Sequence, residues 1–433
     1  MIFFRVSQDI NVKATDGTLI NYFKLKEPSA MENETIYITT YDDYNDLKEI
    51  FSKVDKEKYF PRVLNENRVR TLENFPIELG ILNIFEYDNR ENLNKTTFQN
   101  IEKVDIYKQL KKSAKNEISI VIIGGVGRSI GETISSCTAL RILHKKLKEV
   151  YKNIKMDIYL NASNNSFYTR EKQIYQTQEY INNILPLSIT SKKLCEYDYF
   201  IDNSLSMKFL GLDFTNYVDA WLFKFGIDYK KISENEKYNQ INISNYDIQN
   251  TLQNKIDEAK LKGKLLLFHP YSANINKSIP QNIAIDLLKE LLSKADEYMI
   301  ISTLLIDVKI KDDRFIDLSK ESKNINDFIY IISAMDKIIT TDTSTYHISD
   351  AFMIPTIVIF TDSNFGNKVK YYRYIKPIFI KKVMARRLST LKAVMAMTTP
   401  MCEKRLVILH FVNLRKAWSL RKWRMKTGTP KNF

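Results

Sequence analysis

Cysteine is scarce in this sequence. Its 433 residues include only three cysteines, Cys137, Cys195 and Cys402. They are far apart, odd in number and in no Cys-x-x-Cys arrangement, so the sequence predicts neither a disulfide framework nor a zinc site. This usage is typical of a protein in a reducing cytosol.

Long apolar runs are also lacking. No window contains the roughly 18 consecutive apolar residues that a membrane-spanning helix needs. The apolar run at the start, MIFFRVSQDI, is too short for a signal peptide. We therefore expect a cytoplasmic protein whose contact with a membrane, if any, is peripheral. A content of 44% hydrophobic and 12% aromatic residues excludes a disordered class and suffices for two core-forming domains.

The positive charge is confined to one end of the chain. The net charge is +14, but residues 384–433 hold 12 Lys/Arg and one acid, which leaves 53 basic and 50 acidic residues elsewhere. This tail also has no tyrosine, and such a change of composition is typical of a shifted reading frame or a fusion scar. A basic amphipathic helix is the alternative. Because the rest of the chain is nearly neutral, we expect no nucleic-acid partner.

Residues 118–383 alternate strand-like and helix-like segments in two successive series. The first series contains ISIVII, ETISSCTALRILHKKLKEVYKN, KMDIYLNAS and YDYFIDNS, and the second begins at LLLFHPYS. This alternation predicts an α/β protein with two doubly wound, Rossmann-like domains that bind ligands at the carboxyl ends of their strands. We expect four parts: an N-terminal accessory α/β region at 1–112, two Rossmann-like domains at 118–250 and 260–383, and an atypical basic tail at 384–433.

The first motif is GGVGRSIG, residues 124–131. It approaches the TGxxxGIG turn of short-chain dehydrogenases, in which backbone NH groups at a helix N-terminus hold a diphosphate. An NADP-dependent reductase would also need a Tyr-x-x-x-Lys pair well downstream. The pair Tyr151/Lys155 is too close to the turn, and Tyr372/Lys376 is too far from it. The plainer interpretation is that these glycines let a strand turn tightly into a helix.

The second motif, HPYSANINKSIP, spans residues 269–280. Lys277 comes just before Ile279-Pro280, and proline is suited to the first turn of the helix that follows. A lysine at the start of a helix can point its ammonium group at a phosphate. The alternative is a solvated lysine.

The third motif is DTSTYHISDAFMIPTIVIF, residues 342–360. A helix starting at Thr343-Ser344 would offer unpaired NH groups and its positive end to an anion. Asp342 could accept hydrogen bonds from ligand hydroxyls, and His347 could face the same site. A simple N-cap and a satisfied, half-buried histidine are the alternatives.

The three motifs, in this order and spacing, resemble those of glycosyltransferase family 9, the ADP-heptose:lipopolysaccharide heptosyltransferases, which have the GT-B fold. IGETISSCTALRIL is similar to the family's Gly-Asp turn followed by xxxxxxALRxL, with Gly131-Glu132 over Gly-Asp. The other two motifs match HPGASxxxKRWP and DTGxxHLAAALGxPxVxLF at His269, Pro270, Ser272, Lys277, Pro280, Asp342, Thr343, His347 and Pro355. The resemblance covers about residues 118–365.

The resemblance implies a GT-B-like fold in which an acceptor-side domain, 118–250, and a nucleotide-sugar-binding domain, 260–383, face a cleft. It also implies inverting, metal-independent transfer of a sugar, heptose by resemblance, from a nucleotide diphosphate to a lipopolysaccharide-core or related glycan. No cofactor is then needed besides the ADP-heptose co-substrate, and the acceptor would be met at the cytoplasmic face of the inner membrane.

The resemblance assigns roles to individual residues. Glu132 would be the catalytic base. The acceptor-side loop would include Gly127, Arg128 and Gly131. The donor and its phosphates would be bound by Ser272, Lys277, Asp342, Thr343, Ser344 and His347.

Two departures from the family pattern keep other functions open. Glu132 replaces an aspartate, and Ser344 replaces a glycine that lets the donor approach the backbone. A glycosyltransferase-like binding protein without turnover is therefore one alternative. An NADP-dependent reductase, which rests on the GGVGRSIG motif and not on these departures, is the other.

Overall fold

The computed structural model describes residues 1–25, 32–54, 62–82, 103–110, 117–127, 129–163, 165–203, 216–306, 310–361 and 365–380. Arg128 and the basic tail at 384–433 lie outside these residues. Residues 1–379 form one compact unit.

The N-terminal region is built on two small antiparallel sheets. One has the order β4-β1-β5, and the other is the β2-β3 hairpin. Side chains alternate between buried and exposed along β2 and β3, which is the pattern of strands with one covered face. The elements are β1 (Ile2–Arg5), β2 (Ile10–Lys13), β3 (Leu19–Tyr22), η1 (Glu32–Thr35), β4 (Tyr37–Thr39), α1 (Tyr41–Val54), β5 (Arg62–Leu64), α2 (Glu66–Arg70) and α4 (Ile106–Gln109).

A five-stranded parallel sheet follows, with the order β6-β10-β7-β8-β9. Four of its strands come from residues 117–202, whereas β6 comes from the N-terminal region and pairs with β10. The chain leaves β7 toward β8 on one side and reaches β10 on the other, so the strand order reverses between β7 and β10. The elements of this half are β6 (Ile77–Glu78), β7 (Glu117–Ile123), α5 (Ile130–Lys148), β8 (Asn153–Leu160), α6 (Tyr168–Tyr175), β9 (Asn183–Pro186), α7 (Ser191–Leu194), β10 (Tyr199–Asp202) and α9 (Tyr217–Lys224).

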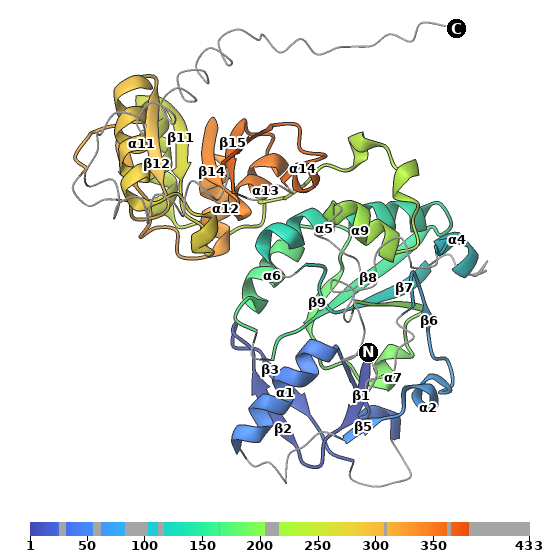
Figure 1. Ribbon diagram of the computed structural model, residues 1–433. Coiled ribbons are helices and arrows are strands. Elements are labelled where there is room, and N and C mark those ends of the chain that lie inside the picture. The colour runs from blue at the N-terminus through green and yellow to red at the C-terminus, as the bar shows by residue number, and fades with distance from the viewer. Residues whose placement is uncertain are drawn as a thin grey trace, which may run out of the picture. The chain divides into compact units, whose positions relative to one another are not determined.

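The second parallel sheet, yellow to orange in Figure 1, has the order β13-β12-β11-β14-β15-β16. This is the 3-2-1-4-5-6 order of the Rossmann fold, and every pair in it is parallel. Its elements are α10 (Asn250–Lys262), β11 (Lys264–His269), η5 (Ile275–Lys277), α11 (Gln281–Lys294), β12 (Tyr298–Ser302), β13 (Phe315–Asp317), α12 (Ile325–Ser333), β14 (Lys337–Thr341), α13 (Ser344–Ala351), β15 (Thr356–Phe360), α14 (Phe365–Lys368) and β16 (Ile375–Phe379).

Hydrophobic burial explains why the central strands form. The side chains of β11 after Lys264 and all those of β12 and β15 are buried, as expected of parallel strands covered by helices on both faces. The α/β class with two Rossmann-like parallel sheets, predicted from the sequence, is confirmed by the strand order. The domain boundaries themselves stay a prediction. Among the described residues, no helix is long and apolar enough to cross a membrane.

The connection between the two halves contains short 3-10 helices, η3 (Tyr229–Lys231) and η4 (Glu234–Glu236), rather than a long helix. Helix α5 contacts α9 on its own side and α13 of the second half. Helix α5 therefore lies beside helices of both halves.

Candidate functional site

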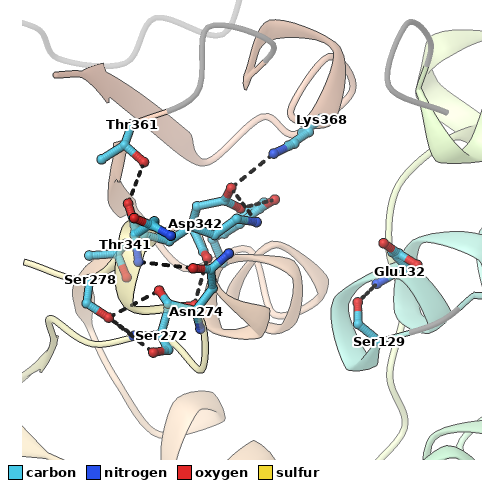
Figure 2. Close-up of polar contacts among 12 residues, drawn as sticks. Ser129, Glu132, Ser272, Asn274, Ser278, Thr341, Asp342, Thr361 and Lys368 are labelled. Carbon is cyan, nitrogen blue, oxygen red and sulfur yellow. Dashed lines mark hydrogen bonds and ion pairs between the residues drawn. The ribbon is translucent and has the colours of Figure 1, made fainter. Parts of the chain in front are cut away.

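Two loops meet where the strand order of the second sheet reverses. Strand β11 ends at His269 and β14 at Thr341, and the two strands are neighbours. The hydroxyl of Ser272 donates a hydrogen bond to the carbonyl oxygen of Asp342 at 3.3 Å, which joins the loops (Figure 2). Open α/β sheets bind ligands at such a reversal.

The loop after β11 is held by its own polar side chains. The backbone NH of Ser272 donates to Ser278 Oγ at 2.9 Å (Figure 2). Asn274 is the N-cap of η5, and its Oδ1 accepts a hydrogen bond from the NH of Asn276 at 3.0 Å. The hydroxyl of Thr361, after β15, donates to the Asn276 carbonyl at 3.1 Å. Lys277 is the last residue of η5, so these bonds fix the backbone that carries it.

Asp342 lies between two lysines. Its Oδ2 is 2.9 Å from Lys277 Nζ and 3.0 Å from Lys368 Nζ. Burial alone would raise the pKa of this carboxyl, but Lys368 and Lys277 outweigh burial and lower it. Asp342 is 6% exposed, while the Lys277 side chain is 34% exposed and can reach a ligand. Two ammonium groups against one carboxylate leave the cluster with an excess positive charge, which favours an anion.

The helix that follows Asp342 adds to this anion site. Helix α13 starts at Ser344, and its N-cap residue, Thr343, makes no side-chain capping bond. The hydroxyls of Thr341 and Thr345 are buried and have no hydrogen-bond partner among the residues that the structure covers. The start of α13 thus presents NH groups and the positive end of the helix dipole beside the lysines.

His347 is buried against helix α5. Its Nδ1 lies 2.9 Å from Ser135 Oγ and 2.6 Å from the hydroxyl of Tyr372. Burial lowers the pKa of His347 to about 3, so the ring is neutral at physiological pH. It is a satisfied, buried histidine, and its predicted role in lining the diphosphate stays a prediction.

Gly131 leaves room for the His347 ring of α13 to pack against α5. A Cβ added at Gly131 would lie 2.4 Å from Cδ2 of the His347 ring. Gly127 has φ of +119°, and a Cβ there would lie 2.6 Å from the backbone nitrogen of Thr133. The space beside both glycines is therefore filled by the protein itself. This packing favours the tight-turn interpretation of GGVGRSIG over a dinucleotide cradle.

Glu132 lies in the first turn of α5. The N-cap Ser129 accepts a hydrogen bond from the Glu132 NH at 3.4 Å (Figure 2), and the Ser-x-x-Glu spacing is that of a capping box. The side chain is half-buried, and its Oε1 accepts a hydrogen bond from the Tyr217 hydroxyl at 3.2 Å.

The hydroxyl of Tyr217 is affected by the charges of both Glu132 and Asp342. Burial, then the carboxylate of Glu132 and then that of Asp342 raise the pKa of the Tyr217 hydroxyl. Both carboxylates therefore act on one hydroxyl. Gly131, next to Glu132, also lies against His347 of α13, the helix that starts just after Asp342, so the structure brings Glu132 near the Asp342 cluster. The sequence did not single out Tyr217 or Lys368, because neither belongs to a recognisable motif.

A cavity of about 420 Å³ adjoins the loop after β11. Most of its lining is apolar and includes Tyr271, Ile275, Ser278, Ile279, Pro280 and Gln281. Among the residues described here, no group of three or more His, Cys, Asp or Glu side chains could hold a metal ion. Arg128, which was predicted to lie in the acceptor-side loop, falls outside the described ranges.

Comparison with known proteins gives distant structural likenesses only. No protein-family model and no curated protein matches the chain. The E. coli ADP-heptose lps heptosyltransferase II is 13% identical with a TM-score of 0.45, over 64% of this chain and 98% of its own. A family 9 glycosyl transferase from Veillonella parvula is 10% identical with a TM-score of 0.44, over 65% and 92%. The E. coli heptosyltransferase WaaC with ADP is 11% identical with a TM-score of 0.41, over 63% and 99%. Similarity at this level assigns no residue and no substrate.

Proposed function

We propose that this protein is a glycosyltransferase of the GT-B, family 9 type that transfers a sugar from a nucleotide diphosphate donor to a glycan. The observation that carries the proposal is the Lys277–Asp342–Lys368 cluster at the strand reversal of the second sheet, next to the start of α13. This arrangement suits a diphosphate, because cations and helix NH groups stabilise clustered phosphate charge.

Glu132 is the base of the proposed reaction. An acceptor hydroxyl attacks the anomeric carbon, a new C–O bond forms, and Glu132 takes the hydroxyl proton. The bond from the anomeric carbon to the diphosphate breaks, and its electron pair leaves with the diphosphate. Attack from the opposite face inverts the anomeric configuration.

The leaving diphosphate is stabilised by the donor-side groups. Lys277 and Lys368 offset its growing charge, and the start of α13 at Thr343-Ser344 contributes NH groups. Asp342 holds the lysines and helps to position the donor, as does Ser272 through its loop. Because lysines and a helix start neutralise the charge, the proposed transfer needs no metal ion or other cofactor.

The sequence motifs support ADP-heptose as the donor and a lipopolysaccharide-core or related glycan as the acceptor. Such an acceptor would place the protein in the cytoplasm, in peripheral contact with the inner membrane. The longer side chain of Glu132, compared with the family's aspartate, moves the carboxylate by one methylene. A catalytically inactive binding protein is the alternative that this difference keeps open.

Calorimetric titration tests the donor site. We expect ADP and ADP-heptose to bind the wild-type protein and to bind about 10- to 100-fold more weakly to Lys277→Ala, because a charged hydrogen bond to phosphate is lost. A matched control is Lys255→Ala, which removes a lysine paired with Glu321 elsewhere in the second half and should leave both affinities unchanged. Binding of NADPH alone, insensitive to Lys277, would contradict the proposal and favour the reductase.

A turnover assay with Glu132→Gln then separates enzyme from binding protein. In EDTA-containing buffer with a truncated lipopolysaccharide core as acceptor, we expect the variant to lose about 10²–10⁴-fold in ADP release while its affinity for the donor persists. Donor binding without sugar transfer by the wild-type protein would identify the inactive alternative.

A further inference from the structure

Tyr217 is the first residue of helix α9 and contacts the side chain proposed as the base. Its hydroxyl donates to Glu132 Oε1 at 3.2 Å, although the two residues are 85 positions apart in the sequence. Because burial and the two nearby carboxylates raise the pKa of Tyr217, its hydroxyl keeps its proton at neutral pH and remains a hydrogen-bond donor.

The start of α9 is fixed by several bonds. Asn216, the N-cap, accepts from the NH of Val218 at 2.9 Å through Oδ1 and donates through Nδ2 to the carbonyl of Asn367 at 2.8 Å. The side chain of Trp221, one turn further, is fully buried. The Tyr217 hydroxyl therefore projects from a backbone that has little freedom to move.

A second set of bonds holds the same helix two residues further on. Lys237 Nζ lies 2.7 Å from Asp219 Oδ1, and the Tyr371 hydroxyl donates to Asp219 Oδ2 at 2.6 Å. We call Asp219, Lys237 and Tyr371 the α9 anchor. Its ion pair is almost fully buried, with side-chain exposures of 2% for Asp219 and 3% for Lys237.

The hydrogen bond from Tyr217 affects how the proposed base is held. A donor at Oε1 limits rotation of the carboxylate, so the group keeps one orientation. Glu132 otherwise has one more rotatable bond than an aspartate, so a fixed partner compensates for the longer side chain.

We propose that Tyr217 is a positioning residue of this active site, which holds the Glu132 carboxylate in the orientation that accepts the acceptor proton. The inference rests on the proposed glycosyl transfer. Tyr217 acts through Glu132 and touches neither the donor nor the acceptor in this scheme.

The variant Tyr217→Phe tests the role. We expect kcat for ADP release to fall about 10- to 100-fold while the KM for ADP-heptose stays within about twofold, because misplacing a catalytic group affects the chemical step. In a Glu132→Gln background, Tyr217→Phe should cause no further loss. Equal kcat in Tyr217→Phe and the wild type, or an equal loss in both backgrounds, would overturn the proposal.

Tyr197→Phe is the matched control. The Tyr197 hydroxyl donates to the Asp157 carboxylate at 2.7 Å, so this variant also removes a buried tyrosine–carboxylate bond, but away from the Glu132 region. We expect its kcat to equal that of the wild type. A similar fall in both tyrosine variants would show a general structural effect and would overturn the positioning role.

A double-mutant cycle on unfolding separates the failure of this inference from failure of the proposed function. We expect Tyr217→Phe and Glu132→Ala, each of which removes the bond, to be coupled by about fivefold or more in the unfolding equilibrium constant. If the wild type transfers no sugar, the proposed function fails. The coupling energy from unfolding still measures the hydrogen bond between Tyr217 and Glu132 in that case. Additive effects on unfolding would refute the bond and, with it, the positioning role.

Discussion

At the scale of single residues, Gly131 has a packing role, because a side chain at this position would collide with a neighbouring helix. The sequence leaves a phosphate-binding turn open beside the plainer interpretation of a tight turn, and the space where a Cβ would lie is occupied by the ring of His347. The ring in turn contacts Ser135 and Tyr372. Glycine at this position therefore permits contact between helices α5 and α13.

Gly131→Ala is expected to lower the free energy of unfolding by about 1–3 kcal/mol, because the added methyl group overpacks a buried contact. Gly366→Ala is the control. Nothing lies within 4 Å of a Cβ at Gly366, so alanine there should change stability by no more than about 1 kcal/mol, in the stabilising direction. Urea unfolding of both variants makes the comparison, and equal stabilities would contradict the contact with His347.

Site residues were predictable only where they belong to a motif. Lys277 and Asp342 follow recognisable strands, and the structure brings them together. Lys368 lies 26 residues beyond Asp342, and Tyr217 lies 85 residues beyond Glu132, with no pattern to relate either pair. The proposed roles of Lys368 and Tyr217 depend on contacts between distant segments. Such contacts cannot be read from the hydrophobic periodicity of a single sequence.

At the scale of elements, the buried parallel strands were the most predictable features. Apolar runs such as ISIVII and LLLFH correspond to β7 and β11, because both faces of these strands are covered. Strand β16, IKPIF, was not predicted. It lies at the edge of its sheet, is only partly buried, and contains a lysine and a proline, which are typical of edge strands.

The α9 anchor is expected to be an important contact between elements. Lys237→Met leaves the buried carboxylate of Asp219 without its closest cation and should cost about 3 kcal/mol of unfolding free energy. The control Lys145→Met removes a lysine from an exposed pair with Glu236 and should cost less than about 1 kcal/mol. Urea unfolding measures the free-energy loss of both variants. Similar losses would show that the buried Asp219–Lys237 pair stabilises the fold no more than an exposed pair does.

At the scale of the whole molecule, the charge and the fold belong to different parts of the chain. Residues 1–379 form one compact unit, whereas most of the net charge comes from residues 384–433. The predicted donor site uses only residues of the compact unit.

A chain ending at residue 383 is therefore expected to keep its midpoint of thermal unfolding within about 3 °C and its affinity for ADP, because the contacts that hold the donor-site residues remain. Binding to nucleic acid, if the full chain shows any, should disappear with the tail. Calorimetry on the full and shortened chains tests both. Loss of ADP affinity in the shortened chain would show that the tail belongs to the site.

The pairing of β6 with β10 also bears on how the protein is made. Ile77 is paired with Tyr199, which a ribosome adds about 120 residues later, or roughly 6–24 s at ordinary rates of synthesis. The β6 segment must wait that long for its neighbour, with its hydrogen-bonding groups unsatisfied by the sheet. The first parallel sheet therefore cannot be completed before β10 has been synthesised, whatever the N-terminal region does earlier.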